Sequence, residues 1–426
     1  MDLRWLPTHF FRNLGSLYGA QATSYLLPLI TIPYIVRTIG PERYGLIALA
    51  TAVVQYAVIV TEYGYNFTAP RDVARKRDDR IELNRYVNAV FWTRLLLAGI
   101  SFIIGSTLLI VLPLLPELKI LVLLTCGVIV GKVLFLQPVF YGLEQAKSIA
   151  RFTIAAAILG VVLIFALIRQ SSDYFFIPLI YSASSIAIGC VSMFWSLRRM
   201  NIRIRKPDVH DVRTELRSGF RVFLSTGMIS LYVVSNTLIL GIFAPSIVVG
   251  WYSAGEKLVR AVQGAFAPFQ NLLFPSISRE VSHGRRHALR SLKKSATLIA
   301  PVGLSVSLLI VLLADPIATL LFGAHFTGTA DVLRILGGIP FIMSLTLLFS
   351  DIFLIGFGYE RYWSTLIMWA GVISIMLSLL LVALLDLRHI GSSFALLITE
   401  LFVLCGALWK YRMETHSGLR IEGEES

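Results

Sequence analysis

The chain has 426 residues, of which 56% are hydrophobic and only 15% are charged, and its mean hydropathy of +0.75 excludes an ordinary soluble domain. Its net charge of +13 does not indicate nucleic-acid binding, because the basic residues form short clusters between apolar stretches and no large polar domain carries them. Composition therefore predicts an all-α protein that spans a membrane several times.

Apolar stretches of roughly 20 residues recur along the whole chain, and each is long enough to cross a bilayer core as a helix. The first stretch is expected to be retained, because residues 20–22 (AQA), which resemble a signal-peptidase site, precede its apolar run instead of following it. Pro268 predicts a kinked helix in the eighth span. We predict twelve spans, at residues 13–36, 44–66, 86–112, 118–141, 148–168, 174–197, 218–243, 247–275, 292–314, 333–357, 361–385 and 390–411.

Basic residues are distributed unevenly between alternate connections. With the N-terminus inside, the inner connections hold 28 of the 38 Lys and Arg residues, and the outer connections hold six. Retained cytoplasmic loops carry such a positive excess, so both termini are expected to be cytoplasmic. The basic run over residues 71–79 follows the second span on this inner side, where it is predicted to form a modest amphipathic helix along the interface.

The longest inner connection begins at Arg198 and leaves six predicted spans on each side. We therefore predict an N-terminal lobe over residues 1–200, a cytoplasmic linker over 201–217, and a C-terminal lobe over 218–426 with a short cytoplasmic tail. Because six is an even number, both lobes enter from the same face, which predicts a parallel repeat. Residues 40–45 (GPERYG) after the first span are echoed by residues 244–252 after the seventh.

Eight ionisable residues lie at membrane depth. A cation at the bilayer centre costs about 2.5–3.5 kcal/mol on insertion scales, so the neighbours of these cations are expected to be one another, a carboxylate or a water-filled cavity. Each carboxylate either neutralises a cation or takes part in ion coupling by binding a proton. The cations are Arg94, Lys132, Lys257 and Arg260, and the carboxylates are Glu62, Glu256, Asp351 and Glu400.

No motif in the chain predicts catalysis, a metal or a cofactor. Residues 127–133 superficially resemble a phosphate-binding loop, but they lack the following Ser or Thr and lie within a span, so Gly127 and Gly131 indicate a close helix contact. His283 and His287 have a spacing that suits a metal on a helix, but the glycine and arginines around them favour a solvated loop. The outer connections are too short for a catalytic domain, so an enzyme is not expected.

Two stretches carry a family resemblance. Residues 29–45 (LITIPYIVRTIGPERYG) and residues 62–72 (EYGYNFTAPRD) resemble bacterial Wzx-type O-antigen flippases, which belong to the polysaccharide transporter branch of the MOP exporter superfamily. The resemblance implies two six-helix lobes around a central cavity in the bacterial cytoplasmic (inner) membrane. It also implies transport of an undecaprenyl-diphosphate-linked oligosaccharide from the cytoplasmic to the periplasmic leaflet by alternating access, coupled to H+ or Na+.

Site residues and partners follow from the same resemblance. Arg37 lies within the quoted signature and is expected near the outer mouth, whereas the four intramembrane cations are assigned to the lumen by their depth. Arg and Lys side chains there offer charge and hydrogen-bond donors to a diphosphate. Membrane lipids, a polysaccharide polymerase and a chain-length regulator are implied partners, and nucleic acid is not.

Other functions remain open at this point. A multidrug or metabolite antiporter of the same fold would usually have an acid-lined cavity, and four intramembrane cations argue against it. A membrane-embedded polymerase or ligase of polysaccharide is disfavoured by the short outer connections. A scaffold for assembly enzymes would leave the intramembrane charges without a purpose.

Overall fold

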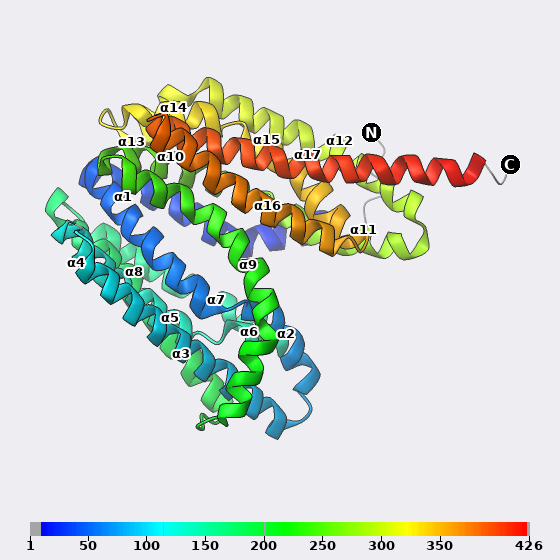
Figure 1. Ribbon diagram of the computed structural model, residues 1–426, viewed down its shortest axis with the longest axis horizontal. Helices are drawn as coiled ribbons and strands as arrows, with labels where there is room; N and C mark the ends of the chain where they lie inside the picture. The colour runs from blue at the N-terminus through cyan, green and yellow to red at the C-terminus, as the bar shows by residue number, and fades with distance from the viewer. Residues whose placement is uncertain (1–9, 114, 200–201, 424–426) are drawn as a thin grey trace. The chain divides into compact units, whose positions relative to one another are not determined.

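Helices joined by short connections make up the described chain (Figure 1). The computed structural model describes residues 10–113, 115–199 and 202–423, and these ranges contain no strand. The predicted all-α membrane class is confirmed, whereas the count of twelve spans stays a prediction. Eight stretches within the described ranges are long and apolar enough to cross a membrane, namely Leu29–Glu62, Arg80–Val111, Pro116–Gly142, Ser171–Arg199, Arg285–Leu312, Thr327–Ile355, Glu360–Leu384 and Arg388–Thr415.

The described chain divides into two compact units, each of which is considered by itself. The N-terminal unit comprises Ile35–Gly241 with Pro245–Gly250. The C-terminal unit comprises Ile242–Ala244 and the described parts of Met1–Tyr34 and Trp251–Ser426. Most of the helix that begins at Val209 therefore falls in the N-terminal unit. The lobe boundaries at 200 and 218 stay a prediction.

The first ten elements follow the apolar pattern, and they lie in the N-terminal unit except for the first helix up to Tyr34 and the last two residues of the helix that ends at Phe243. The first helix contains the first predicted span and most of the second, and it is interrupted between them at Gly40, whose φ of 80° is unfavourable for a residue with a side chain. The elements are α1 (Phe10–Glu62), α2 (Tyr65–Lys76), α3 (Arg80–Val111), α4 (Pro116–Thr125), α5 (Gly127–Leu134), α6 (Gln137–Gly142), α7 (Ala146–Leu167), η1 (Ser171–Phe175), α8 (Phe176–Arg199) and α9 (Val209–Phe243).

The two segments that echo one another in sequence lie against each other in the N-terminal unit. A Cβ built on Gly45 would be 1.8 Å from the carbonyl oxygen of Ser246, and one built on Gly250 would be 2.0 Å from the carbonyl oxygen of Pro41. The contact is therefore reciprocal, because each segment offers a glycine to the main chain of the other. Two backbones approach this closely only where the side chain is absent.

The fourth predicted span is divided into α4, α5 and α6. The predicted close contact at Gly127 and Gly131 is confirmed, because added Cβ atoms would be 2.7 Å from Ser182 Cβ and 2.2 Å from Ser185 Oγ on α8. The end of α5 is set by Phe135, whose extended backbone follows the last helical residue. This early end leaves main-chain carbonyl groups without helical donors.

Ten elements follow in the described residues, and all of them lie in the C-terminal unit except the first five residues of the helix that begins at Ser246. Within the predicted span over 247–275 the helix stops at Gly264 and a second helix begins at Ala267, so the chain is interrupted next to Pro268, where a kink was predicted. A π-helical segment holds Asp351. The elements are α10 (Ser246–Gly264), α11 (Ala267–His283), α12 (Arg285–Leu312), α13 (Ala314–Phe322), α14 (Thr327–Leu336), α15 (Ile339–Thr346), η2 (Leu347–Ile355), α16 (Glu360–Ser378), η3 (Leu379–Leu384) and α17 (Arg388–Gly423).

Large apolar side chains on the outside of the units agree with a lipid environment. On α3, Ile103, Ile104 and Ile110 are exposed, although each is strongly hydrophobic. A soluble protein rarely exposes such a continuous apolar surface, whereas lipid tails solvate it without cost. This part of α3 therefore presents a strongly hydrophobic surface outward.

Candidate functional site

Glu62 and Lys132 form an ion pair in the N-terminal unit. The Nζ atom of Lys132 on α5 is 3.2 Å from Oε1 of Glu62, which is the last residue of α1. The side-chain amide of Asn66, the second residue of the next helix, donates a hydrogen bond of 3.1 Å to the other oxygen of Glu62. The Lys132 side chain keeps 38% of its surface exposed, so its charge remains accessible despite the pairing.

Arg94 is held differently, by main-chain carbonyl groups. It is only 3% exposed on α3, and its guanidinium donates hydrogen bonds of 2.6 Å to the carbonyl of Lys132 and 3.3 Å to that of Phe135. These two carbonyls belong to the C-terminal end of α5, where a cation is favoured by the helix dipole and by the missing helical donors. Arg94 thus fastens α3 to the end of α5.

A second charged group lies in the C-terminal unit. Arg260 Nε donates a hydrogen bond of 2.9 Å to Oε1 of Glu256, one turn earlier on α10, and its Nη2 is 2.8 Å from the same oxygen. Glu400 on α17 is 5% exposed and lies close enough to Arg260 and Asp351 to interact electrostatically with both. Arg260 therefore has two carboxylate neighbours, Glu256 and Glu400, and Asp351 interacts with Glu400.

Asp351 is positioned by the π-helical segment η2. Its two carboxylate oxygens accept long hydrogen bonds of 3.4 Å, one from the side-chain amide of Gln270 and one from the indole of Trp363. Such π-helical turns occur often at functional sites, because the wider turn redirects a side chain. Asp351 is thereby turned toward polar donors of α11 and α16.

The two remaining predicted cations lie outside the contacts described above. Arg37 is exposed on α1, and Lys257 is half-buried on α10, one turn from Arg260. The structure therefore brings the predicted residues into two separate groups, one in each unit. The assignment of the cations to substrate and of the carboxylates to ion coupling stays a prediction.

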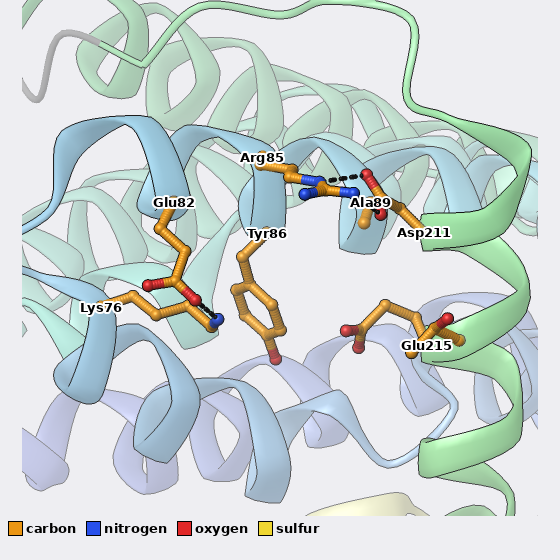
Figure 2. Close-up of a pocket in the computed structure, with 8 residues that line it drawn as sticks. Lys76, Glu82, Arg85, Tyr86, Ala89, Asp211 and Glu215 are labelled. Atoms are coloured by element: carbon orange, nitrogen blue, oxygen red, sulfur yellow. Dashed lines mark hydrogen bonds and ion pairs between the residues drawn. The ribbon is translucent and has the colours of Figure 1, made fainter.

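Sequence reasoning missed a pocket of about 170 Å³ at one end of the N-terminal unit (Figure 2). Two ion pairs border it, Lys76 with Glu82 and Arg85 with Asp211. In the second pair, Nε and Nη2 of Arg85 donate hydrogen bonds of 2.7 Å to the two carboxylate oxygens of Asp211. The first pair joins α2 to α3 across the turn between them, and the second joins α3 to α9, which is distant in sequence. The pocket's carboxylates, Glu82, Asp211 and Glu215, lie in or beside the two basic inner connections, which sequence analysis used chiefly to assign topology.

Metal chemistry finds no ligand set in the residues that the structure describes. Among these residues, no group of three or more His, Cys, Asp or Glu side chains is placed to hold a metal ion. His287 is exposed next to the turn at Gly284, and the side chain of His283 lies outside the described part.

A protein family and two named proteins match this chain over most of its length. The model of the family described as "Polysaccharide biosynthesis protein" matches residues 10–281. A protein of Escherichia coli (strain K12) named "Putative O-antigen transporter" is 28% identical over 392 residues, which cover 92% of this chain and 94% of that protein. A protein of Shigella dysenteriae with the same name is 24% identical over 367 residues, which cover 86% of this chain and 91% of that protein.

Solved structures with a similar fold are membrane transporters. The lipid II flippase MurJ in an inward closed conformation has a TM-score of 0.72 at 15% identity, and the match covers 92% of this chain and 86% of that chain. An inward-facing multidrug resistance MATE family transporter of the MOP superfamily has a TM-score of 0.67, also at 15% identity, over 91% and 95% of the two chains. At this identity the likeness shows the fold alone, and it confirms the transporter fold that the sequence predicted.

Proposed function

Because the chain belongs to the polysaccharide biosynthesis protein family, we propose that it is a flippase for a lipid-linked oligosaccharide. The substrate class in this proposal is an undecaprenyl-diphosphate carrying an O-antigen or similar repeat unit, moved from the cytoplasmic to the periplasmic leaflet. The observation that carries the proposal is the match of 92% of the chain to a protein named as an O-antigen transporter. The transporter fold supports it.

The diphosphate is the part of such a substrate that hydrocarbon excludes, and the partly exposed cations are its proposed partners. Lys132 and Arg260 retain 38% and 34% side-chain exposure, so a phosphate oxygen can reach either charge. Arginine binds phosphate with two parallel donors and lysine with a compact charge. One such cation in each unit is consistent with a headgroup that passes through an alternating-access cycle.

Carboxylate partners suggest how an ion could be coupled to this binding. Glu62 neutralises Lys132, and Glu256 neutralises Arg260, when no substrate is bound. A diphosphate that takes over these cations would leave the carboxylates with uncompensated charge unless they bind H+ or Na+. We therefore infer an exchange in which the diphosphate and the carboxylate compete for the same cation. The transmembrane potential adds about 2.3 kcal/mol per charge per 100 mV to such a cycle.

Arg94 has a different role in this proposal. Its guanidinium is committed to two carbonyls at the end of α5, one of which belongs to Lys132 itself. This geometry supports a positioning role, in which Arg94 holds the helix end that presents Lys132. Substrate contact by Arg94 itself would require those hydrogen bonds to break.

A leaflet-resolved assay tests the proposed function. Purified protein is reconstituted into vesicles that contain undecaprenyl-diphosphate-linked oligosaccharide in one leaflet, and the lipid reaching the other leaflet is measured with and without the protein. We expect protein-dependent movement that slows when the H+ or the Na+ gradient is collapsed with a selective ionophore. Protein-free vesicles and vesicles with the Lys132→Gln variant serve as controls.

Two outcomes would contradict the proposal. Movement of the lipid at the rate of protein-free vesicles, from a sample that remains folded, would remove the flippase function. Gradient-driven export of a cationic drug without any movement of the lipid would favour the antiporter of the same fold instead.

A further inference from the structure

The connection between α8 and α9 is bound along α3 by a ladder of side chains. Asn84, Asn88 and Trp92 are four residues apart and therefore share one face of α3. Asn84 Oδ1 accepts a hydrogen bond of 2.7 Å from the amide of Arg203, and Asn88 Nδ2 donates one of 2.7 Å to the carbonyl of that residue. Asn88 Oδ1 accepts one of 2.6 Å from the amide of Arg205, and Trp92 Nε1 donates one of 2.9 Å to the Arg205 carbonyl. Alternate residues of the linker thus have their main-chain groups satisfied by α3.

The first half of α9 is clamped to the same unit. Arg85 on α3 makes two hydrogen bonds of 2.7 Å to the carboxylate of Asp211, one turn into α9. Further along, the hydroxyl of Tyr63 donates a hydrogen bond of 2.9 Å to the carbonyl of Leu216, and its ring stacks on Phe223 with centroids 4.7 Å apart. The linker and the start of α9 are therefore attached to α3 and to the end of α1 by one continuous set of contacts.

Glu215 is the exception within this clamp. Figure 2 shows its side chain pointing from α9 toward Tyr86, into the pocket of about 170 Å³ between α2, α3 and α9. It is half-buried, and no hydrogen bond or ion pair to its carboxylate is made by the residues that the structure describes. Its neighbours Lys76 and Arg85 are already paired with Glu82 and Asp211.

The charges that face Glu215 come from all three helices around the pocket. From α2 come the carboxylate of Asp72, the ammonium of Lys76 and the hydroxyl of Tyr65; from α3 come Glu82, Arg85 and Tyr86; and from α9 itself comes Asp211. Burial raises the pKa of Glu215 to about 7, with help from the negative charges of Asp72 and Asp211 and against the opposing effect of Lys76. Protonation of Glu215 therefore removes both the cost of burying its charge and its repulsion by Asp72 and Asp211.

We propose that Glu215 is a proton-binding site whose occupancy determines how firmly the linker and the first half of α9 are held on α2 and α3. The protonated side chain fits the pocket, whereas the ionised one places a third carboxylate beside Asp72 and Asp211. The site lies on the side that the distribution of basic residues assigns to the cytoplasm. It is separate from the carboxylates at membrane depth, and it does not depend on which lipid is transported.

The direction of the pH effect follows from the raised pKa. A carboxyl group whose pKa is higher in the attached state than in a detached one stabilises attachment at low pH, and this contribution is lost as pH rises toward the attached-state value. Attachment is therefore firmest near pH 5 and below. It weakens up to about tenfold per pH unit until about pH 7, above which it changes little.

Distance measurements between two spin labels test the proposal. Ile81 at the start of α3 and Val209 at the start of α9 are both exposed, so Ile81→Cys and Val209→Cys accept labels without entering the core. The labels are placed in the full chain with Cys126, Cys190 and Cys405 replaced by serine, in lipid vesicles between pH 5 and 8.5. We expect a short distance at low pH and a growing longer-distance fraction that levels off above about pH 7.

Variants of the pocket separate this proposal from a general effect of pH. Glu215→Gln is expected to keep the short distance at every pH. Asp72→Asn removes one charge that repels Glu215, so it is expected to increase the fraction of attached molecules at pH 7. Glu42→Gln, an exposed glutamate elsewhere on α1, is the control and should respond like the unmodified chain. Distances that do not change with pH, or an unaltered pH response in Glu215→Gln, would overturn the proposal.

Discussion

Arg94 and Arg260 are both arginines at membrane depth, but different partners hold them. Arg260 is paired with Glu256 and keeps a third of its side chain exposed, whereas Arg94 is buried and bonded to two carbonyls. Loss of Arg260 leaves a carboxylate that can bind a proton. Loss of Arg94 leaves carbonyl oxygens at a helix end without hydrogen-bond donors, and a carbonyl cannot bind a proton in the same way.

We therefore expect Arg94→Ala to destabilise the protein more than Arg260→Ala does. Hydrogen bonds to a charged group contribute about 1.5–3 kcal/mol each, so Arg94→Ala should cost at least about 2 kcal/mol of unfolding free energy. Thermal unfolding of the purified variants in one detergent measures the difference. Arg94→Lys, which keeps the charge but has fewer donors, should fall between Arg94→Ala and the unmodified chain. Equal unfolding temperatures for Arg94→Ala and Arg260→Ala would contradict the proposal that Arg94 stabilises the end of α5.

Sequence reasoning reached the charged residues but not all of their partners. Depth along a span placed Lys132 and Arg260 next to a carboxylate as one of three options, and the structure shows such a contact for each. The partner of Arg94 was not predictable, because nothing in the apolar pattern shows that α5 ends at Leu134. The Glu215 pocket was missed for a similar reason, since its residues come from three segments that only the fold brings together.

At the scale of elements, hydropathy located the helices but not their interruptions. The span predicted over residues 118–141 is three helices, and the one over 247–275 is two. An apolar residue has the same hydropathy in a continuous helix and in a break, so a window of apolar residues does not register the change of backbone angle. The break at Gly40 was easier to place, because a turn-forming GPERYG sequence surrounds it.

The reciprocal glycine contact predicts a strong effect of a single methyl group. In Gly250→Ala the new Cβ would lie 2.0 Å from the carbonyl oxygen of Pro41, so the two backbones must separate, at a cost of about 1–3 kcal/mol. Gly105→Ala on α3 is the matched control, because nothing lies within 4 Å of its added Cβ and alanine favours the helix. Unfolding temperatures of the two variants are compared. A Gly250→Ala protein as stable as Gly105→Ala would show that the contact is looser than described.

At the scale of the whole molecule, the central question is whether the ion pairs at membrane depth serve transport or only stability. A pair that is only structural is neutralised without loss when both partners are changed, because no uncompensated charge remains. A pair in which the cation binds substrate behaves differently, since removal of the cation is harmful whether or not the carboxylate is present. Glu62 and Lys132 allow this distinction, because their contact lies within one unit.

We expect Lys132→Gln to lower the rate of lipid movement in the vesicle assay by about 10-fold or more, which corresponds to the loss of one charge-assisted hydrogen bond. Glu62→Gln should keep movement of the lipid but lose part of its dependence on the H+ gradient, because Lys132 is then free of its competitor. The double variant should be as slow as Lys132→Gln alone. Recovery of the rate in the double variant would instead identify the pair as a structural contact, and Lys132 would have to be withdrawn from the proposed substrate site.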